Sequence, residues 1–286
     1  MRIAAAQARP VWLDRDATTR KAIDLIGEAA HQGARLVAFP ETFLSGYPVW
    51  ILHFDGQGVE ASLERRAYAQ YLESSVELDG PHVQGLIDAS AEHDVFVFLG
   101  ISERGTGAAR DTVYCTLLAI DPQRGLVSAR RRLVPTPRER RVWGGGDGQG
   151  MRAHRLDGIR VGGLSCWENW MPHARYALYA DGEELHVATW PGWYPRTAEI
   201  AKFIAIEGRV AVLSVAGLLL PEDISEDFAL AGALRERELR GLGLDGGSAV
   251  VAPDGSWVVA PVRGEERLVV ADIEPSQLRA RRVAAG

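Results

Sequence analysis

Short apolar runs alternate with stretches of helical periodicity along this chain of 286 residues. Residues 3–7 form an apolar run of strand length. Between residues 17 and 32 the apolar side chains recur at helical spacing, and Gly33 follows as a typical helix terminator. Residues 36–39 form a second buried strand, which Pro40 ends. The chain therefore opens with a strand–helix–strand unit, which is typical of α/β packing.

The same alternation continues to the end of the chain. Further strands are predicted at residues 95–101, 112–120, 125–131, 159–165, 185–189, 209–215, 248–252, 257–260 and 267–273. Helices are predicted at residues 81–93, 171–180 and 198–207, and a short basic helix at the end of the chain. Residues 218–238 are expected to form a surface loop and a helix. No linker-like segment divides the chain, so residues 1–286 are expected to form a single domain.

Composition narrows the class of protein. The chain is 47% hydrophobic with a net charge of −6 and a pI of about 5.7, which argues against a nucleic-acid partner. Its two cysteines, Cys115 and Cys166, are expected to be free thiols in a cytoplasmic protein. The first residues do not resemble a signal peptide, and no apolar run is long enough to predict a membrane span. The seven histidines show no ligand-like spacing.

Two polar residues stand directly after apolar strands, where α/β proteins place their active sites. Glu41 follows residues 36–39 and Pro40, and partial burial would raise its pKa toward the range of a general base. By itself this could be an ordinary loop glutamate. Cys166 follows residues 159–165, and a helix starting there would lower its thiol pKa and offer backbone amides to an anion. By itself it could be a small buried hydrophobe.

A third segment, RRRLVPTPRER at residues 130–140, could be a solvated strand edge. Taken together, the three segments resemble, in order and wording, the glutamate, lysine and cysteine motifs of the nitrilase superfamily of carbon–nitrogen hydrolases. CWENWMP at residues 166–172 is similar to the signature of nitrilases proper, whereas amidase branches more often follow the cysteine with tyrosine and aspartate. The segments YCT at residues 114–116 and VWGGGDG at residues 142–148 also resemble nitrilases.

The resemblance extends over nearly the whole chain and implies an α/β fold, a four-layer α-β-β-α sandwich of the nitrilase type. It implies Cys166 as nucleophile, Glu41 as general base, Glu139 as a second glutamate that orients a neighbour or positions water, and no metal or organic cofactor. The predicted activity is hydrolysis of a small-molecule nitrile to the carboxylic acid and ammonia. Residues near the motifs are expected to bind the substrate: Tyr47, Trp167, Glu168, Asn169 and Trp190. Neighbouring aromatics, which ordinary packing would equally explain, are Phe43, Trp50, Trp193 and Tyr194.

One position departs from the family pattern, because the catalytic lysine of the family falls on Arg132. Arginine keeps the positive charge and the ability to stabilise an anion, but it does not readily give up a proton. Two alternatives therefore stay open: an amidase of the same superfamily, and a catalytically impaired homologue that binds a small molecule. Lys202 is not expected to substitute for the missing lysine. Because the sequence stops at Gly286, without the longer tail of nitrilases proper, a homodimer or larger homo-oligomer is expected rather than long spirals.

Overall fold

Two β-sheets form the centre of the molecule. The computed structural model describes residues 1–55, 61–192, 195–235, 244–274, 276 and 278. The first sheet has the strand order β13-β1-β2-β3-β4-β5, with β6 paired to β4: β1 (Arg2–Gln7), β2 (Leu36–Ala38), β3 (Phe96–Arg104), β4 (Val113–Asp121), β5 (Gly125–Arg131), β6 (Trp143–Gly144) and β13 (Arg267–Asp272). The second has the order β12-β11-β10-β9-β8-β7: β7 (His154–Leu156), β8 (Ile159–Ser165), β9 (Leu185–Trp190), β10 (Ala211–Ala216), β11 (Gly246–Val251) and β12 (Trp257–Arg263).

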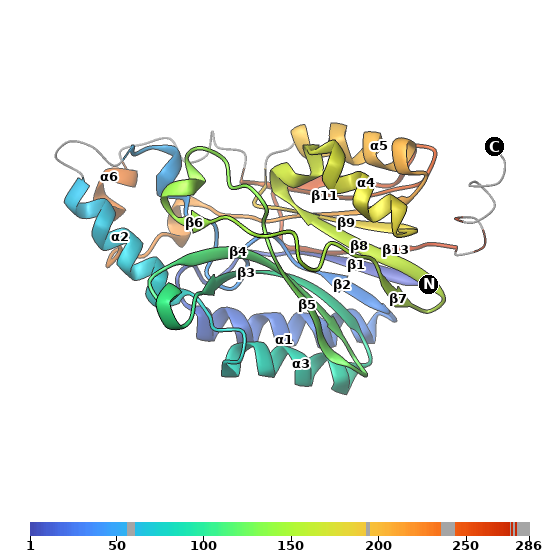
Figure 1. The fold of residues 1–286 in the computed structure, drawn as a ribbon, viewed down its shortest axis with the longest axis horizontal. Coiled ribbons are helices and arrows are strands. Elements are labelled where there is room, and N and C mark those ends of the chain that lie inside the picture. Colours follow the sequence, from blue (N-terminus) through green and yellow to red (C-terminus); the bar gives the residue numbers. More distant parts are fainter. Residues whose placement is uncertain (56–60, 193–194, 236–243, 275, 277, 279–286) are drawn as a thin grey trace.

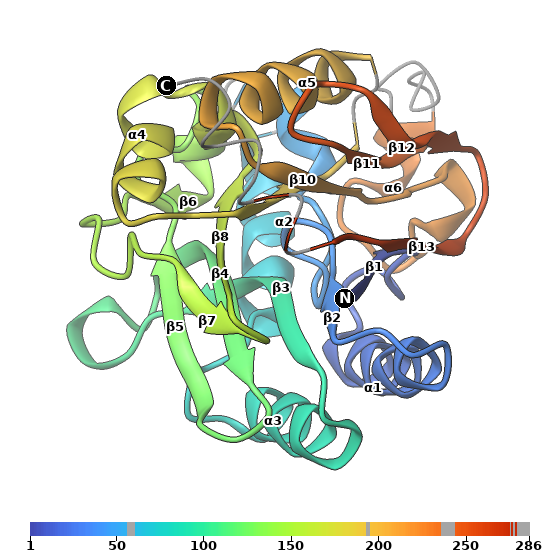
Figure 2. The ribbon, with the colours of Figure 1, turned by 90° about the vertical axis from the view of Figure 1, so that its right-hand side faces the viewer.

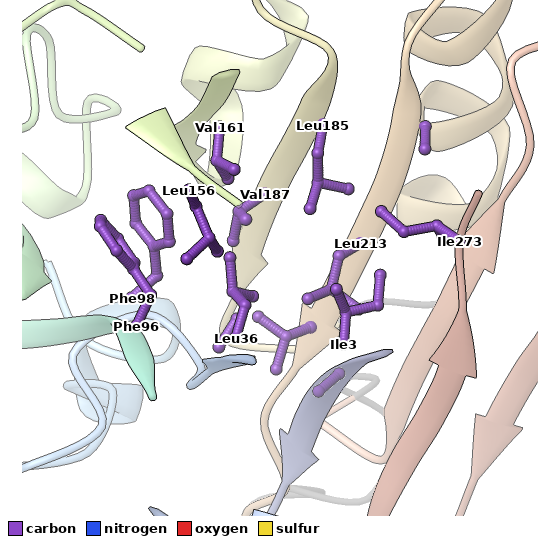
Figure 3. Packing of buried hydrophobic residues seen from close by; sticks show 14 of the residues in the cluster. Ile3, Leu36, Phe96, Phe98, Leu156, Val161, Leu185, Val187, Leu213 and Ile273 are labelled. Atoms are coloured by element: carbon purple, nitrogen blue, oxygen red, sulfur yellow. The ribbon is translucent and has the colours of Figure 1, made fainter. Parts of the chain in front are cut away.

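The two sheets pack face to face through apolar side chains. Ile3, Leu36 and Phe96 point from the first sheet toward Val187 and Leu213 of the second, as Figure 3 shows. All five are completely or almost completely buried. Strands β1, β2 and β3 run parallel, as do β8, β9 and β10. Parallel strands covered on both faces read as continuous apolar runs, which explains why the hydrophobic pattern located them.

Helices cover the outer faces of both sheets. The first sheet is covered by α1 (Arg15–His31) and α3 (Pro81–His93), and the second by α4 (Pro172–Ala180) and α5 (Arg196–Gly208). Figures 1 and 2 show the resulting order of layers, α-β-β-α. The predicted four-layer sandwich is therefore confirmed. Among the residues that the structure describes, no helix is both long and apolar enough to cross a bilayer.

Two parts of the sequence prediction were wrong. Helix α2 (Ala61–Ser74) was not predicted, because only three of its residues, Ala67, Tyr71 and Ser74, are buried. Within residues 218–238 the expected helix is present as α6 (Ala231–Arg235), but the segment before it is not a simple surface loop: it contains η6 (Pro221–Asp223), and its apolar side chains pack against Trp12, Trp50 and Tyr71. Most of the predicted C-terminal helix lies outside the described residues, as do Trp193 and Tyr194.

Candidate active site

Glu41 lies at the end of β2, where the first sheet meets the second. Its backbone N–H donates to the carbonyl oxygen of Trp190, at the end of β9, over 3.4 Å, and its side chain is buried. The turn packs directly on Gly100 of β3. A Cβ atom at Gly100 would lie 2.5 Å from both the Pro40 oxygen and the Thr42 nitrogen. A glycine on β3 is therefore required for the Glu41 turn to adopt this position.

Arg132 follows β5 and lies between two carboxylates. Its Nη1 is 3.1 Å from Glu41 Oε1 and its Nη2 is 2.9 Å from Glu139 Oε2, and all three side chains are buried. Glu139, at the start of η4 (Glu139–Arg141), also accepts hydrogen bonds from the Tyr47 hydroxyl (3.1 Å) and the Thr136 amide (2.7 Å). The guanidinium thus connects the two glutamates, and Glu139 is held by neutral donors as well.

Cys166 is the first residue of η5 (Cys166–Trp170), directly after β8. Its backbone is in the left-handed region, with φ of 50°, a conformation that costs energy for a residue other than glycine and is concentrated at functional sites. The thiol is buried, and both cysteines are free, as predicted. A capping box between Ser165 and Glu168 holds the start of η5. The strained turn aims Cys166 toward the glutamates rather than along the helix.

The structure brings the four expected residues together: three of them follow strands, and Glu139 begins η4. One carboxylate oxygen each of Glu41 and Glu139 and the sulfur of Cys166 lie within 4.8 Å of one another. Three such atoms could also bind a metal ion. The guanidinium of Arg132, however, already pairs with both carboxylates and supplies positive charge at this point.

Burial shifts the proton affinity of both reactive groups upward. Loss of solvent raises the pKa of Glu41 to about 7, although the nearby Arg132 opposes the change. Loss of solvent and the nearby Glu41 also raise the pKa of the Cys166 thiol well above its ordinary value, while Arg132 and the Trp167 backbone amide act in the opposite direction. The expected rise in the pKa of Glu41 is therefore present. The prediction that the turn lowers the pKa of Cys166 was wrong, because burial outweighs the effect of a short helix.

Glu168 was expected to bind the substrate, but the structure gives its carboxylate other partners. It forms a buried two-point ion pair with Arg130, at 2.9 and 2.8 Å. It also accepts hydrogen bonds from the amides of Leu133 (2.8 Å) and Ser165 (3.1 Å). These partners hold the pKa of Glu168 below its ordinary value despite burial. Glu168 therefore connects the chain segment after Arg132 to the turn before Cys166.

The remaining expected substrate-binding residues are placed differently from one another. The Asn169 side chain is fully buried among protein partners. The Trp190 indole donates to Ser214 Oγ at 3.0 Å and belongs to the same buried cluster as Cys166. Tyr47 lies beside Glu139, whereas Trp167 is 36% exposed and packs on Trp170. Of these residues, Tyr47 contacts the catalytic group directly, through its hydrogen bond to Glu139. Phe43 and Trp50 pack in the buried clusters that include Phe39 and Tyr71, respectively.

Sequence reasoning missed several residues that contact the site. The Cys115 thiol, on β4, donates to Glu41 Oε1 over 3.4 Å. His186, on β9, donates toward Asn169. The available signal was polar side chains inside otherwise apolar strands, VYCTLLAID and LHVATW. Lys202 lies on α5 over the ring of Trp257, at 4.6 Å, which agrees with the expectation that it does not replace the family lysine.

Comparison with known proteins agrees with this geometry. The family model for carbon–nitrogen hydrolases matches residues 2–283. The chain is 36% identical to an aliphatic nitrilase of Rhodococcus rhodochrous, over 99% of this chain and 78% of the relative. It is 35% identical to a nitrilase of Pseudomonas syringae, over 100% of this chain and 84% of the relative.

Solved structures show the same fold at lower identity. A carbon–nitrogen hydrolase superfamily protein of Xanthomonas campestris has a TM-score of 0.73 at 19% identity, covering 99% of this chain and 94% of that one. An amidase of Nesterenkonia has a TM-score of 0.69 at 19% identity, covering 100% and 94%. The chain therefore belongs to the carbon–nitrogen hydrolase family, and it is a nitrilase-type hydrolase that acts on carbon–nitrogen bonds other than peptide bonds.

Proposed function

We propose that this protein is a nitrilase, which converts an organic nitrile and two water molecules to a carboxylic acid and ammonia. The observation that carries the proposal is the meeting of Cys166, Glu41 and Glu139 within 4.8 Å beside the Arg132 guanidinium. A nucleophile, a base and a fixed cation are the groups that covalent hydrolysis of a carbon–nitrogen bond requires. Relatives named as nitrilases, 32–36% identical to the chain, support nitriles as the substrate class.

The first step forms a bond between the Cys166 sulfur and the nitrile carbon. Burial keeps the thiol protonated at rest, so its proton passes to Glu41 as the sulfur attacks. A Glu41 pKa of about 7 is well placed for accepting and returning a proton near neutral pH. The nitrile nitrogen takes up the proton, and the product is a thioimidate on Cys166.

Two water molecules complete the reaction. The first adds to the thioimidate carbon, the carbon–nitrogen bond breaks, and ammonia leaves behind a thioester. The second adds to the thioester, the carbon–sulfur bond breaks, and the carboxylic acid leaves with the thiol restored. Glu139, which is hydrogen-bonded to Tyr47 and paired with Arg132, fits a role in orienting Arg132 or positioning water.

Arg132 would act through charge alone. The charged guanidinium is held by both glutamates, where it would stabilise the anionic intermediates that form after each attack. Because it does not give up a proton, the proton that ammonia needs on leaving comes from Glu41. This assigns to Glu41 the proton transfers that a lysine would share.

Substrate preference is tested directly by ammonia release. The panel contains aromatic, arylaliphatic and aliphatic nitriles, cyanide and the amide matching each nitrile, with Cys166→Ala as the control. Release from nitriles that disappears in Cys166→Ala supports the proposal. Faster release from the matched amides would instead support an amidase. No release from any compound, by a folded protein with free thiols, would contradict it and support the impaired, binding-only alternative. The cytoplasmic location and the homo-oligomer remain predictions.

A further inference from the structure

A chain of three buried polar side chains lies behind the Cys166 turn, and the reaction described above uses none of them. Glu183 precedes β9, His186 lies on β9, and Asn169 lies on η5; all three are 0% exposed. His186 Nδ1 is 3.0 Å from both carboxylate oxygens of Glu183, and its Nε2 is 2.8 Å from Asn169 Oδ1. Buried polar groups of this kind are costly unless each one is hydrogen-bonded.

The hydrogen-bonding pattern determines where the protons lie. Asn169 Nδ2 donates to the carbonyl oxygens of Leu164 (3.1 Å) and Cys166 (3.0 Å), so the amide oxygen must face His186. An amide oxygen only accepts, and His186 Nε2 therefore carries a hydrogen. On its other side, His186 Nδ1 faces the Glu183 carboxylate. His186 Nε2 therefore donates a hydrogen bond to Asn169 Oδ1, and this bond holds the Asn169 side chain in one orientation.

Asn169 transmits this constraint to the nucleophile. Its side chain holds the carbonyl of Cys166, the residue with the left-handed backbone. Its own carbonyl accepts a hydrogen bond from Arg175 Nη1 (2.9 Å), and the Arg175 side chain also pairs with Glu207 at 2.7 Å. The strained turn is therefore held from the β9 side by His186 and from the helix side by Arg175.

Strand β8 leaves room for this arrangement. A Cβ atom at Gly162 would lie 2.2 Å from Glu183 Oε1, so a larger residue there would displace the carboxylate. From these observations we propose that His186, which contacts Glu183 on its other side, is a positioning residue that acts through Asn169 to keep the Cys166 thiol buried and aimed at the scissile carbon. The catalytic consequence rests on the proposed function, whereas the effect on the thiol does not.

Two substitutions of His186 separate a directed role from general packing. The amide of glutamine reaches the position of Nε2 and keeps a donor for Asn169. The shorter asparagine reaches only the position of Nδ1, so His186→Asn leaves Asn169 Oδ1 without a donor. His154→Gln is the matched control, because this histidine is also buried in the second sheet but packs against Phe96 and Phe98. Asn169→Asp, which cannot donate to the Cys166 carbonyl, provides an independent variant.

The rate at which each cysteine thiol is alkylated measures how firmly the turn at Cys166 is held. Each variant is treated with iodoacetamide, and alkylation of Cys166 and of Cys115 is measured separately by peptide mass spectrometry. Both thiols are buried, so general loosening would expose both, whereas release of the turn would expose Cys166 alone. Steady-state turnover of the best nitrile and thermal unfolding are measured on the same preparations.

For His186→Asn we expect the ratio of Cys166 to Cys115 alkylation to rise at least about fivefold, and kcat to fall about tenfold or more with KM little changed. His186→Gln and His154→Gln should stay within about threefold of the unsubstituted protein in both measurements. Asn169→Asp should behave like His186→Asn. If His186→Asn does not fold, Asn169→Asp carries the test.

Equal loss of kcat in His186→Asn and His186→Gln would overturn the proposal, as would an unchanged alkylation ratio in folded Asn169→Asp. If the unsubstituted protein hydrolyses neither nitriles nor amides, the proposed function fails. The alkylation ratio still decides the positioning role in that case, because it needs no substrate.

Discussion

Replacing Glu41 by glutamine tests the electrostatics of the site most directly. Burial raises the pKa of this carboxyl from 4.5 to about 7, so ionising it in the folded protein costs more than in the unfolded chain. At about 1.4 kcal/mol per pKa unit, the shift corresponds to about 3 kcal/mol. The isosteric amide cannot ionise and does not carry this cost.

The direction in which stability changes with pH follows from the pKa of Glu41, which is 4.5 in the unfolded chain and about 7 in the folded protein. Below pH 4.5 Glu41 is protonated in both states, and its contribution to stability is fully present. As the pH rises from 4.5 to about 7, the unfolded chain releases the proton while the folded protein keeps it, and stability is lost. From this group alone the free energy of unfolding should be about 2.5 kcal/mol lower at pH 8 than at pH 5.

Urea denaturation of the unsubstituted protein and of Glu41→Gln, at pH 5 and pH 8, measures this effect. Relative to the unsubstituted protein, Glu41→Gln should gain about 2.5 kcal/mol between the two pH values. Its kcat should fall about 100-fold or more, and kcat/KM of the unsubstituted protein should rise with pH through about 7. Glu168→Gln is the matched control: its partners hold the pKa of Glu168 below 4.5, so its contribution is lost only at lower pH and its substitution should leave the difference between pH 5 and pH 8 nearly unchanged.

A difference between Glu41→Gln and the unsubstituted protein that is the same at both pH values, within about 0.5 kcal/mol, would refute this reasoning. It would mean that Glu41 ionises in the folded protein as easily as in the unfolded chain. Turnover that persists in Glu41→Gln at the original rate would separately remove Glu41 from the role of base.

Three further substitutions give distinct expectations. Arg132→Lys keeps the positive charge but cannot pair with Glu41 and Glu139 at the same time through two nitrogens. Its kcat should stay within about tenfold of the unsubstituted protein, and its free energy of unfolding should fall by about 1–3 kcal/mol. A large rise in its ammonia release would instead mean that arginine impairs the natural enzyme. Gly100→Ala forces a Cβ atom against the turn of Glu41, so urea denaturation should show a loss of about 1–3 kcal/mol together with a lower kcat. Arg130→Met leaves Glu168 as an unpaired buried charge and should cost about 3–5 kcal/mol, whereas a neutral result would show that Glu168 is protonated or solvated.

The local pattern of the sequence was sufficient for the long buried strands, for the helices that cover the two sheets and for the two residues at the strand exits, but not for α2. Parallel strands buried on both faces produce apolar runs, and each run ends where the chain turns. Glu41 and Cys166 were therefore visible as polar or reactive side chains that directly follow such runs. The substitution of arginine for the family lysine at Arg132 was visible only through the resemblance to the family motif.

The tertiary structure decided which groups meet and what surrounds them. The expected low pKa of Cys166 was overturned by burial next to Glu41, a residue 125 positions earlier in the chain (166 minus 41). Glu168 was expected to contact substrate, yet its ion pair with Arg130 depends on two different sheets packing together. A sequence pattern reports the local chain, whereas desolvation and hydrogen-bond partners depend on contacts between distant segments, which exist only after the sheets have packed.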